Sequence, residues 1–168
     1  MGGHKKRRYR QTGCTVNRIS FAASGPPRLT QVDFYQIESS EDPLVFACRL
    51  IEKVYRLGHQ IHVHVSSETQ ASALDALLWS FKATAFIPHE RAQKNARAPI
   101  VICHEAIPDQ HHDVLINLNP GIPEFFSRFN RVAEIVPKDD EKRAAARERF
   151  RFYKTRGYPL KYHKMAGR

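Results

Sequence analysis

Residues 32–65 read VDFYQIESSEDPLVFACRLIEKVYRLGHQIHVHV and contain a strand, a helix and a second strand in that order. Residues 32–37 are rich in β-branched and aromatic side chains, which is typical of a strand. Capping residues and a proline follow, and apolar side chains then recur every three or four positions up to Gly58, which predicts a helix. Residues 61–65 alternate strictly between apolar and histidine side chains and predict another strand. A strand–helix–strand unit of this kind favours a parallel sheet.

The alternation of strands and helices continues along the chain. Apolar spacing predicts further helices over residues 68–79, 123–129 and about 140–156. Short apolar runs predict strands over residues 85–87, 100–103, 114–117 and 132–136. We therefore expect an α/β fold: one Rossmann-like domain with a mostly parallel, open sheet and helices on both faces.

Length and composition agree with one domain. The chain has 168 residues, of which 42% are hydrophobic, and this is enough to bury a core. A mean hydropathy of −0.51, without an apolar run near the ~20 residues that a span needs, argues against a transmembrane protein. The three cysteines have no paired spacing, which argues against a disulfide scaffold or a zinc module and favours a reducing compartment such as the cytoplasm.

The net charge of +10 is concentrated at the two ends. Residues 1–28 carry seven Lys or Arg and no acidic side chain, and residues 141–168 carry ten Lys or Arg against two Glu. The body between them is mildly acidic, unlike a surface that wraps duplex DNA. Residues 1–28 have no apolar period, so we expect a disordered basic extension. Three interpretations of this extension stay open: a variable tail, an organellar transit peptide or a nucleic-acid-binding arm. We place the domain at 29–162 and a tail at 163–168.

Familiar catalytic and cofactor motifs are missing. The turn after the first strand has acidic residues and no glycine, so a nucleotide pyrophosphate could not approach its backbone. His62 and His64 share one face of a strand, but no metal-binding motif frames them, and polar positions on a half-exposed strand explain them equally well. The pair Cys103-His104 closes a strand, where a cysteine is more often packing than nucleophile. We therefore expect no enzyme active site, no cofactor and no metal.

The last predicted helix carries a stripe of cations. At about 100° per residue, Arg143, Arg147, Arg151 and Lys154 fall within one narrow sector, and Phe150 lies beside it. Such a stripe can hold a carboxylate by charge-assisted hydrogen bonds while an apolar side chain packs alongside. A solvated helix face would give the same spacing, so the pattern alone leaves both interpretations open.

Large aromatic side chains gather after the second helix. Trp79, the only tryptophan, ends that helix, and Phe86 follows seven residues later in a Phe-Ile-Pro-His segment. Aromatic side chains at such a position either belong to the core or anchor a protein interface.

Five segments, taken together and in register, resemble the chi subunit of bacterial DNA polymerase III holoenzyme over about residues 31–162. These are VDFY at 32–35, LDALLW at 74–79, FIPH at 86–89, DVLINL at 113–118 and ARERFRFY at 146–153. The resemblance implies a Rossmann-like fold without nucleotide chemistry. Residues 1–28 match nothing in the family pattern.

The resemblance also implies partners. Chi proteins pair with the psi subunit, which joins them to the clamp loader, and they bind the acidic C-terminal tail of single-stranded-DNA-binding protein. We therefore expect a cytoplasmic, non-catalytic adaptor in a 1:1 heterodimer with psi, in contact with DNA mainly indirectly and with no membrane. The alternative is a basic domain that binds single-stranded nucleic acid directly through its two cationic ends.

The family pattern assigns two groups of site residues. The tail-binding positions lie on the last helix and on the strand end before it: Val136, Arg143, Arg147, Phe150 and Arg151. Relatives often have lysine and tyrosine where this chain has arginine and phenylalanine, which keeps charge and apolar surface but loses a hydroxyl. The psi-facing positions are Trp79, Phe86, Pro88 and His89.

Overall fold

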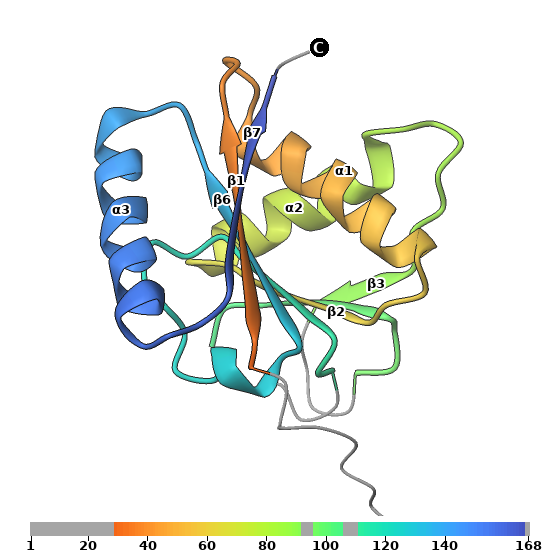
Figure 1. Cartoon of the computed structure of the whole chain (residues 1–168). Coiled ribbons are helices and arrows are strands. Elements are labelled where there is room, and N and C mark those ends of the chain that lie inside the picture. The colour runs from red at the N-terminus through yellow and green to blue at the C-terminus, as the bar shows by residue number, and fades with distance from the viewer. Residues whose placement is uncertain (1–28, 92–95, 106–110, 167–168) are drawn as a thin grey trace, which may run out of the picture.

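The computed structural model describes residues 29–91, 96–105 and 111–166, and the basic extension expected at 1–28 lies outside these residues. The described part forms a twisted sheet between two layers of helices (Figure 1). Its strands are β1 Gln31–Ile37, β2 Ile61–His64, β3 His89–Arg91, β4 Ile100–Cys103, β5 Val114–Asn117, β6 Arg131–Val136 and β7 Leu160–Met165. Its helices are α1 Pro43–Arg56, α2 Glu68–Ser80, the short 3-10 helix η1 Phe126–Arg128 and α3 Asp140–Thr155.

The sheet has the order β3-β4-β2-β5-β6-β1-β7, and all six neighbouring pairs are parallel. Helices α1 and α2 cover one face and α3 covers the other (Figure 1). The two faces follow from the direction of the crossovers. The chain moves one way across the sheet through α1 and α2 and the opposite way through α3, and right-handed connections then require opposite faces. The predicted α/β class with a parallel open sheet is confirmed.

Each α-helix begins at a side-chain cap that the sequence provides. The side chains of Asp42, Ser67 and Asp139 accept hydrogen bonds from backbone N–H groups in the first turns of α1, α2 and α3. Gly58 and Gly157, which follow α1 and α3, have φ angles of +86° and +77°, a conformation that favours glycine.

Two apolar clusters hold the layers together. Ile51, Leu74 and Ile102 belong to the cluster between the sheet and the helices α1 and α2. Phe34 and Tyr153 belong to the cluster on the α3 side. Burial of each such side chain contributes about 1.5–3 kcal/mol to folding. Among the described residues, no helix combines the length and the hydropathy that a membrane span requires.

Two local predictions are wrong. Residues 85–87 form no strand, because only Ile87 is buried and Phe86 is 73% exposed. The strand of this region is β3, which begins after Pro88, a residue that has no N–H for the ladder. Residues 123–129 contain only the three-residue η1 instead of a longer helix.

The last strand was missed altogether. Strand β7 pairs with β1 and runs through residue 162, where we placed the end of the domain, to Met165. Its sequence LKYHKM lacks apolar alternation, because β7 lies at the edge of the sheet and is largely exposed. Lysines on an edge strand are common, since they discourage pairing with another chain.

His62 and His64 are buried, which corrects the half-exposed strand that their alternation predicted. Their rings pack against Phe125, with centroids 5.6 and 5.3 Å away. Burial lowers the pKa of His62 to about 3, and the neighbouring His64 adds to this shift. Strand β2 lies in the interior of the sheet, so both of its faces are covered.

Candidate functional site: a cationic groove beside α3 and an aromatic patch beside α2

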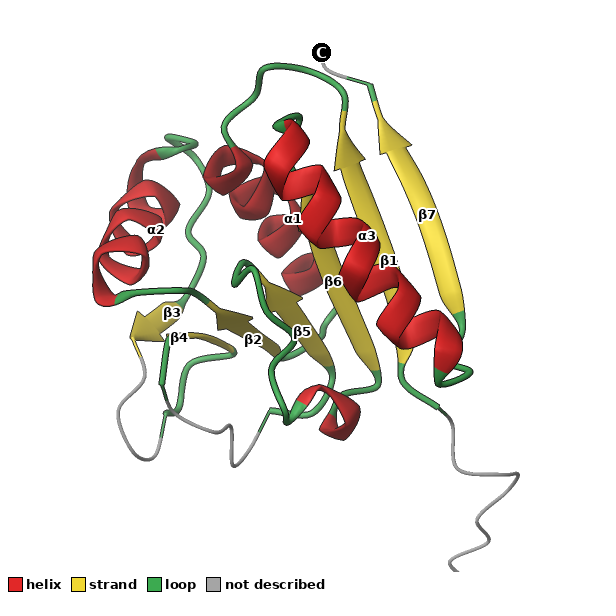
Figure 2. Ribbon diagram, turned by 90° about the vertical axis from the view of Figure 1, so that its left-hand side faces the viewer, coloured by secondary structure: helices red, strands yellow, loops and turns green. Residues whose placement is uncertain are grey.

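A groove of about 390 Å³ lies between α3 and the sheet edge formed by β1 and β7. Figure 2 shows α3 in front of β6 and β1, with β7 beside them. Side chains alternate between the faces of a strand, so Phe34 of β1 and its register partner Tyr162 of β7 both face α3. The groove is lined by Phe34, Gln36, Val136, Arg143, Ala146, Arg147, Phe150, Arg151 and Tyr162.

The floor and one wall of the groove are apolar. Phe34 and Val136 are buried beneath it. The ring of Phe150 meets Phe34 edge-on at 5.3 Å, and Tyr162 stacks on Phe34 at 6.3 Å. Tyr162 remains 47% exposed, so the groove offers aromatic surface to a ligand. An apolar side chain entering here would meet the aromatic residues that line the groove.

Three arginines of α3 line the groove, and their partners differ. The guanidinium of Arg143 lies 3.6 Å from the carboxylate of Glu38, and that of Arg151 lies 2.9 Å from Glu148. Within the described ranges, Arg147 has no ion pair or hydrogen bond. Burial raises the pKa of the Tyr162 phenol, while Arg143 and Arg147 act in the opposite direction, so both cations lie near this hydroxyl. A carboxylate in the groove would meet an unpaired guanidinium.

The five tail-binding positions implied by the resemblance all line this one groove. Lys154, which the helical spacing placed in the same stripe, is exposed in the last turn of α3 and is not part of the lining. The groove also contains Phe34, Gln36 and Tyr162, which sequence reasoning missed because they come from distant strands. Their role in binding, like that of the five, stays a prediction.

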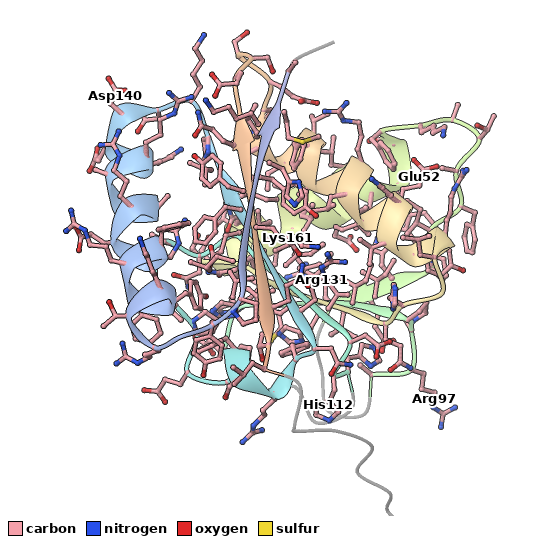
Figure 3. The ribbon with its side chains drawn as sticks, viewed as in Figure 1. Glu52, Arg97, His112, Arg131, Asp140 and Lys161 are labelled. Carbon is pink, nitrogen blue, oxygen red and sulfur yellow. The ribbon has the colours of Figure 1, made fainter. Side chains whose placement is uncertain are left out.

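The side of α3 that faces the sheet carries a buried ion pair. Arg149 is buried, and its Nε donates to Oε2 of Glu134 at 3.0 Å. Asn117 and Tyr153 also donate to this carboxylate, at 3.0 and 2.9 Å. Burial raises the pKa of Glu134, and Arg149 and the hydrogen bonds oppose that shift. This network anchors the inner side of α3 to the sheet, so the groove arginines lie on a different side of the helix (Figure 3 shows side chains filling the space between α3 and the sheet).

The aromatic residues near α2 form an exposed patch. Trp79 is 57% exposed, and its ring lies 5.8 Å from that of Phe86 and 4.8 Å from that of His89. The His89 side chain is fully buried, with Nδ1 2.7 Å from the Ile87 carbonyl and Nε2 3.1 Å from Asp75. His89 therefore supports the patch from below. We name Trp79, Phe86, Pro88 and His89 the aromatic patch.

The groove and the aromatic patch lie at opposite edges of the sheet. The patch adjoins β3, which forms one edge, and the groove adjoins β7, which forms the other. The groove is also on the α3 face, whereas α2 covers the opposite face (Figure 1). Two ligands could therefore bind at the same time without touching each other.

Other polar clusters in the described residues fit structural roles. On the far side of β1, buried Asp33 contacts Arg131 and His163, and Figure 3 labels Arg131 beneath α1. His62 and His64 both pack against Phe125, and no group of three or more His, Cys, Asp or Glu side chains in the described ranges is arranged to hold a metal ion.

Comparison with known families decides between the possible identities. The family model of the DNA polymerase III chi subunit, HolC, matches residues 29–161. The chain belongs to the chi subunit family. The family resemblance drawn from the five sequence segments is confirmed.

Relatives of known name agree. DNA polymerase III subunit chi of Pseudomonas aeruginosa is 46% identical over 139 residues, which cover 82% of this chain and 98% of the relative. The chi subunits of Haemophilus influenzae and Escherichia coli are 32% and 31% identical, covering 68% and 67% of this chain and 81% and 79% of their own. The crystal structure of T4 UvsW shares the fold with a TM-score of 0.58 at 7% identity, over 82% of this chain and 41% of that one.

Proposed function

We propose that this chi-family chain is a non-catalytic adaptor subunit of the DNA polymerase III clamp-loader complex. In this proposal, the aromatic patch binds the psi subunit, and the cationic groove binds the acidic C-terminal tail of single-stranded-DNA-binding protein. The protein works in the bacterial cytoplasm during DNA replication, forms a 1:1 heterodimer with psi, and contacts DNA mainly through its partners.

One observation carries the assignment of the groove. The guanidinium of Arg147, which has no ion pair within the described part of the chain, lies over an apolar hollow formed by Phe34, Phe150 and Val136. A free C-terminal residue with an apolar side chain fits both features. Its carboxylate pairs with the arginine, and its side chain enters the hollow. Acidic residues that precede the C-terminal residue of such a peptide would meet Arg143 and Arg151, which flank Arg147 on α3.

The aromatic patch supports the second assignment. Exposed Trp79 and Phe86 are costly to leave in water and are among the residue types that dominate binding energy in protein interfaces. The buried His89 ring packs against Trp79 and contacts the Ile87 carbonyl through Nδ1, so the patch is ordered before a partner arrives, which reduces the entropy lost on binding.

A peptide titration tests the proposal. We expect calorimetry to show 1:1 binding of a synthetic peptide that carries several aspartates and a C-terminal phenylalanine with a free carboxylate. The same peptide with an amidated end should bind at least tenfold more weakly. Equal binding of both peptides would contradict a carboxylate grip in the groove. A strong, salt-dependent affinity for a bare single-stranded oligonucleotide, without any partner, would favour the direct nucleic-acid binder instead.

A further inference from the structure

Glu38 places a carboxylate of the protein itself beside Arg143, one of the residues that line the groove. It follows the last residue of β1, and its backbone N–H donates to the Met165 carbonyl of β7 at 3.1 Å. Oε2 of Glu38 lies 3.6 Å from the terminal nitrogen of Arg143. Arg143 lines the groove, so this arginine, like Arg151 beside Glu148, is already engaged by an internal anion.

A series of hydrogen bonds orients this carboxylate. The Tyr162 hydroxyl donates to Oε1 of Gln36, and the Gln36 amide donates to Oε1 of Glu38. The series therefore runs from the aromatic wall of the groove to the Arg143 guanidinium. Gln36 and Tyr162 both line the groove, so this series is within reach of a ligand that enters it.

The contact between Glu38 and Arg143 is poor for an arginine–carboxylate pair. A separation of 3.6 Å exceeds a normal charge-assisted hydrogen bond, and the Ile37 carbonyl accepts from the same nitrogen at a long 3.4 Å. Nε of Arg143 is buried without a hydrogen-bond partner among the described residues. A ligand carboxylate that paired with both terminal nitrogens of the guanidinium would satisfy Arg143 better than Glu38 does.

We infer that Glu38 is an intramolecular competitor for the groove, which holds Arg143 until an acidic peptide displaces it. The inference rests on the proposed function of the groove. Glu38 then acts as a specificity residue: it lowers the affinity for every acidic ligand, so only a ligand that also fills the apolar hollow binds well. An ordinary surface ion pair at this position would instead leave peptide affinity unchanged.

The test is a titration of the Glu38→Gln variant with the aspartate-rich peptide that ends in a free phenylalanine. We expect affinity to rise about three- to tenfold in low salt, and less in high salt, because the lost repulsion is screened over roughly 8–10 Å. The matched control is Glu41→Gln, which removes the same charge from the same loop, where Glu41 pairs with Arg49 outside the groove. Its affinity should stay within about twofold of the parent protein.

A double variant distinguishes competition for Arg143 from a general effect of removing a negative charge. In the Arg143→Ala protein, Glu38→Gln should bring no further gain, because the group for which Glu38 competes is gone. A gain that persists there, an equal gain in Glu41→Gln, or an unchanged affinity in Glu38→Gln would overturn the inference. If neither the parent protein nor Glu38→Gln binds the peptide, the proposed function of the groove fails, and the inference fails with it.

Discussion

Arg149 and Glu134 form a buried ion pair, with Nε and Oε2 3.0 Å apart, between α3 and the sheet. Arg147, two residues earlier on the same helix, faces the groove and has no such partner among the described residues. Two residues along a helix correspond to about 200°, so the buried pair and the groove lie on different sides of α3. The ion pair thus sets the direction in which the groove arginines point.

Arg149→Met should therefore destabilise the protein strongly. The change leaves the Glu134 carboxylate buried without its cation, which costs about 3–5 kcal/mol of unfolding free energy. Urea denaturation measures this loss. The control is Arg151→Met, which removes an exposed ion pair and should cost less than about 1 kcal/mol. Similar losses in the two variants would show that the buried pair has no special role.

Arg147→Ala should weaken binding of the acidic peptide about ten- to hundredfold. The loss of a charge-assisted hydrogen bond costs on the order of 1.5–3 kcal/mol, which corresponds to that factor. Calorimetry measures it, and Lys154→Ala, an exposed cation on the same helix outside the groove lining, should leave the affinity nearly unchanged. Binding of psi should be intact in both variants. If Arg147→Ala binds the peptide as tightly as the parent protein, Arg147 does not bind the terminal carboxylate.

Trp79→Ala and Phe86→Ala should each abolish binding of psi while lowering the thermal midpoint only modestly. Both side chains are more than half exposed, so their removal leaves no large cavity. Analytical gel filtration of the mixed subunits measures complex formation. Leu57→Ala is the matched control, because Leu57, directly after α1, is 67% exposed and does not belong to the aromatic patch. Psi binding by both aromatic variants, or their unfolding, would refute the interface assignment.

Stability should fall as the pH drops from about 6.5 towards 3, in part because of His62. Its folded-state pKa is lowered to about 3 by burial, so the unfolded chain binds one more proton in this window. Between these pH values His62 changes the free energy of unfolding by up to about 1.4 kcal/mol per pH unit. Its stabilising contribution is complete above about pH 6.5 and is lost as the pH falls. Denaturant titrations at several pH values measure it. His62→Leu should flatten the slope, whereas His112→Gln, at an exposed position, should keep it.

Deletion of residues 1–28 should leave the melting temperature and the binding of psi unchanged. The sequence of this segment offers no apolar period with which to pack on the domain. Differential scanning calorimetry of the full and shortened chains measures the difference, and a drop of several degrees would show that the segment packs on the domain.

The sequence predicted most elements, because their signals are local. The caps and the spacing of apolar residues gave α1, α2 and α3 to within one or two residues. Strand β7 was missed because an exposed edge strand needs no apolar alternation. The burial of His62 and His64 was missed for the opposite reason, since polar side chains in an interior strand imitate a half-exposed one.

The candidate site was predicted only in part. The five groove positions came from the family resemblance, because helical spacing alone left a solvated face equally open. Phe34, Gln36 and Tyr162 come from β1 and β7, whose pairing brings together residues more than 120 positions apart. Helical periodicity contains no information on such pairs. The orientation of α3, which brings its arginines to the groove, depends on the contact between Arg149 and Glu134 of β6.

The width of the sheet has a mechanical consequence. Seven strands spaced about 4.8 Å apart set the groove and the aromatic patch roughly 30 Å from each other, across a core that does not bend easily. Ligands bound at the two edges are thus held at a fixed distance from each other. The two sites share no residue, so their binding free energies add. If each edge holds its proposed partner, the protein is a rigid spacer. Where both partners belong to one assembly, the second contact becomes intramolecular and strengthens the attachment without any new contact.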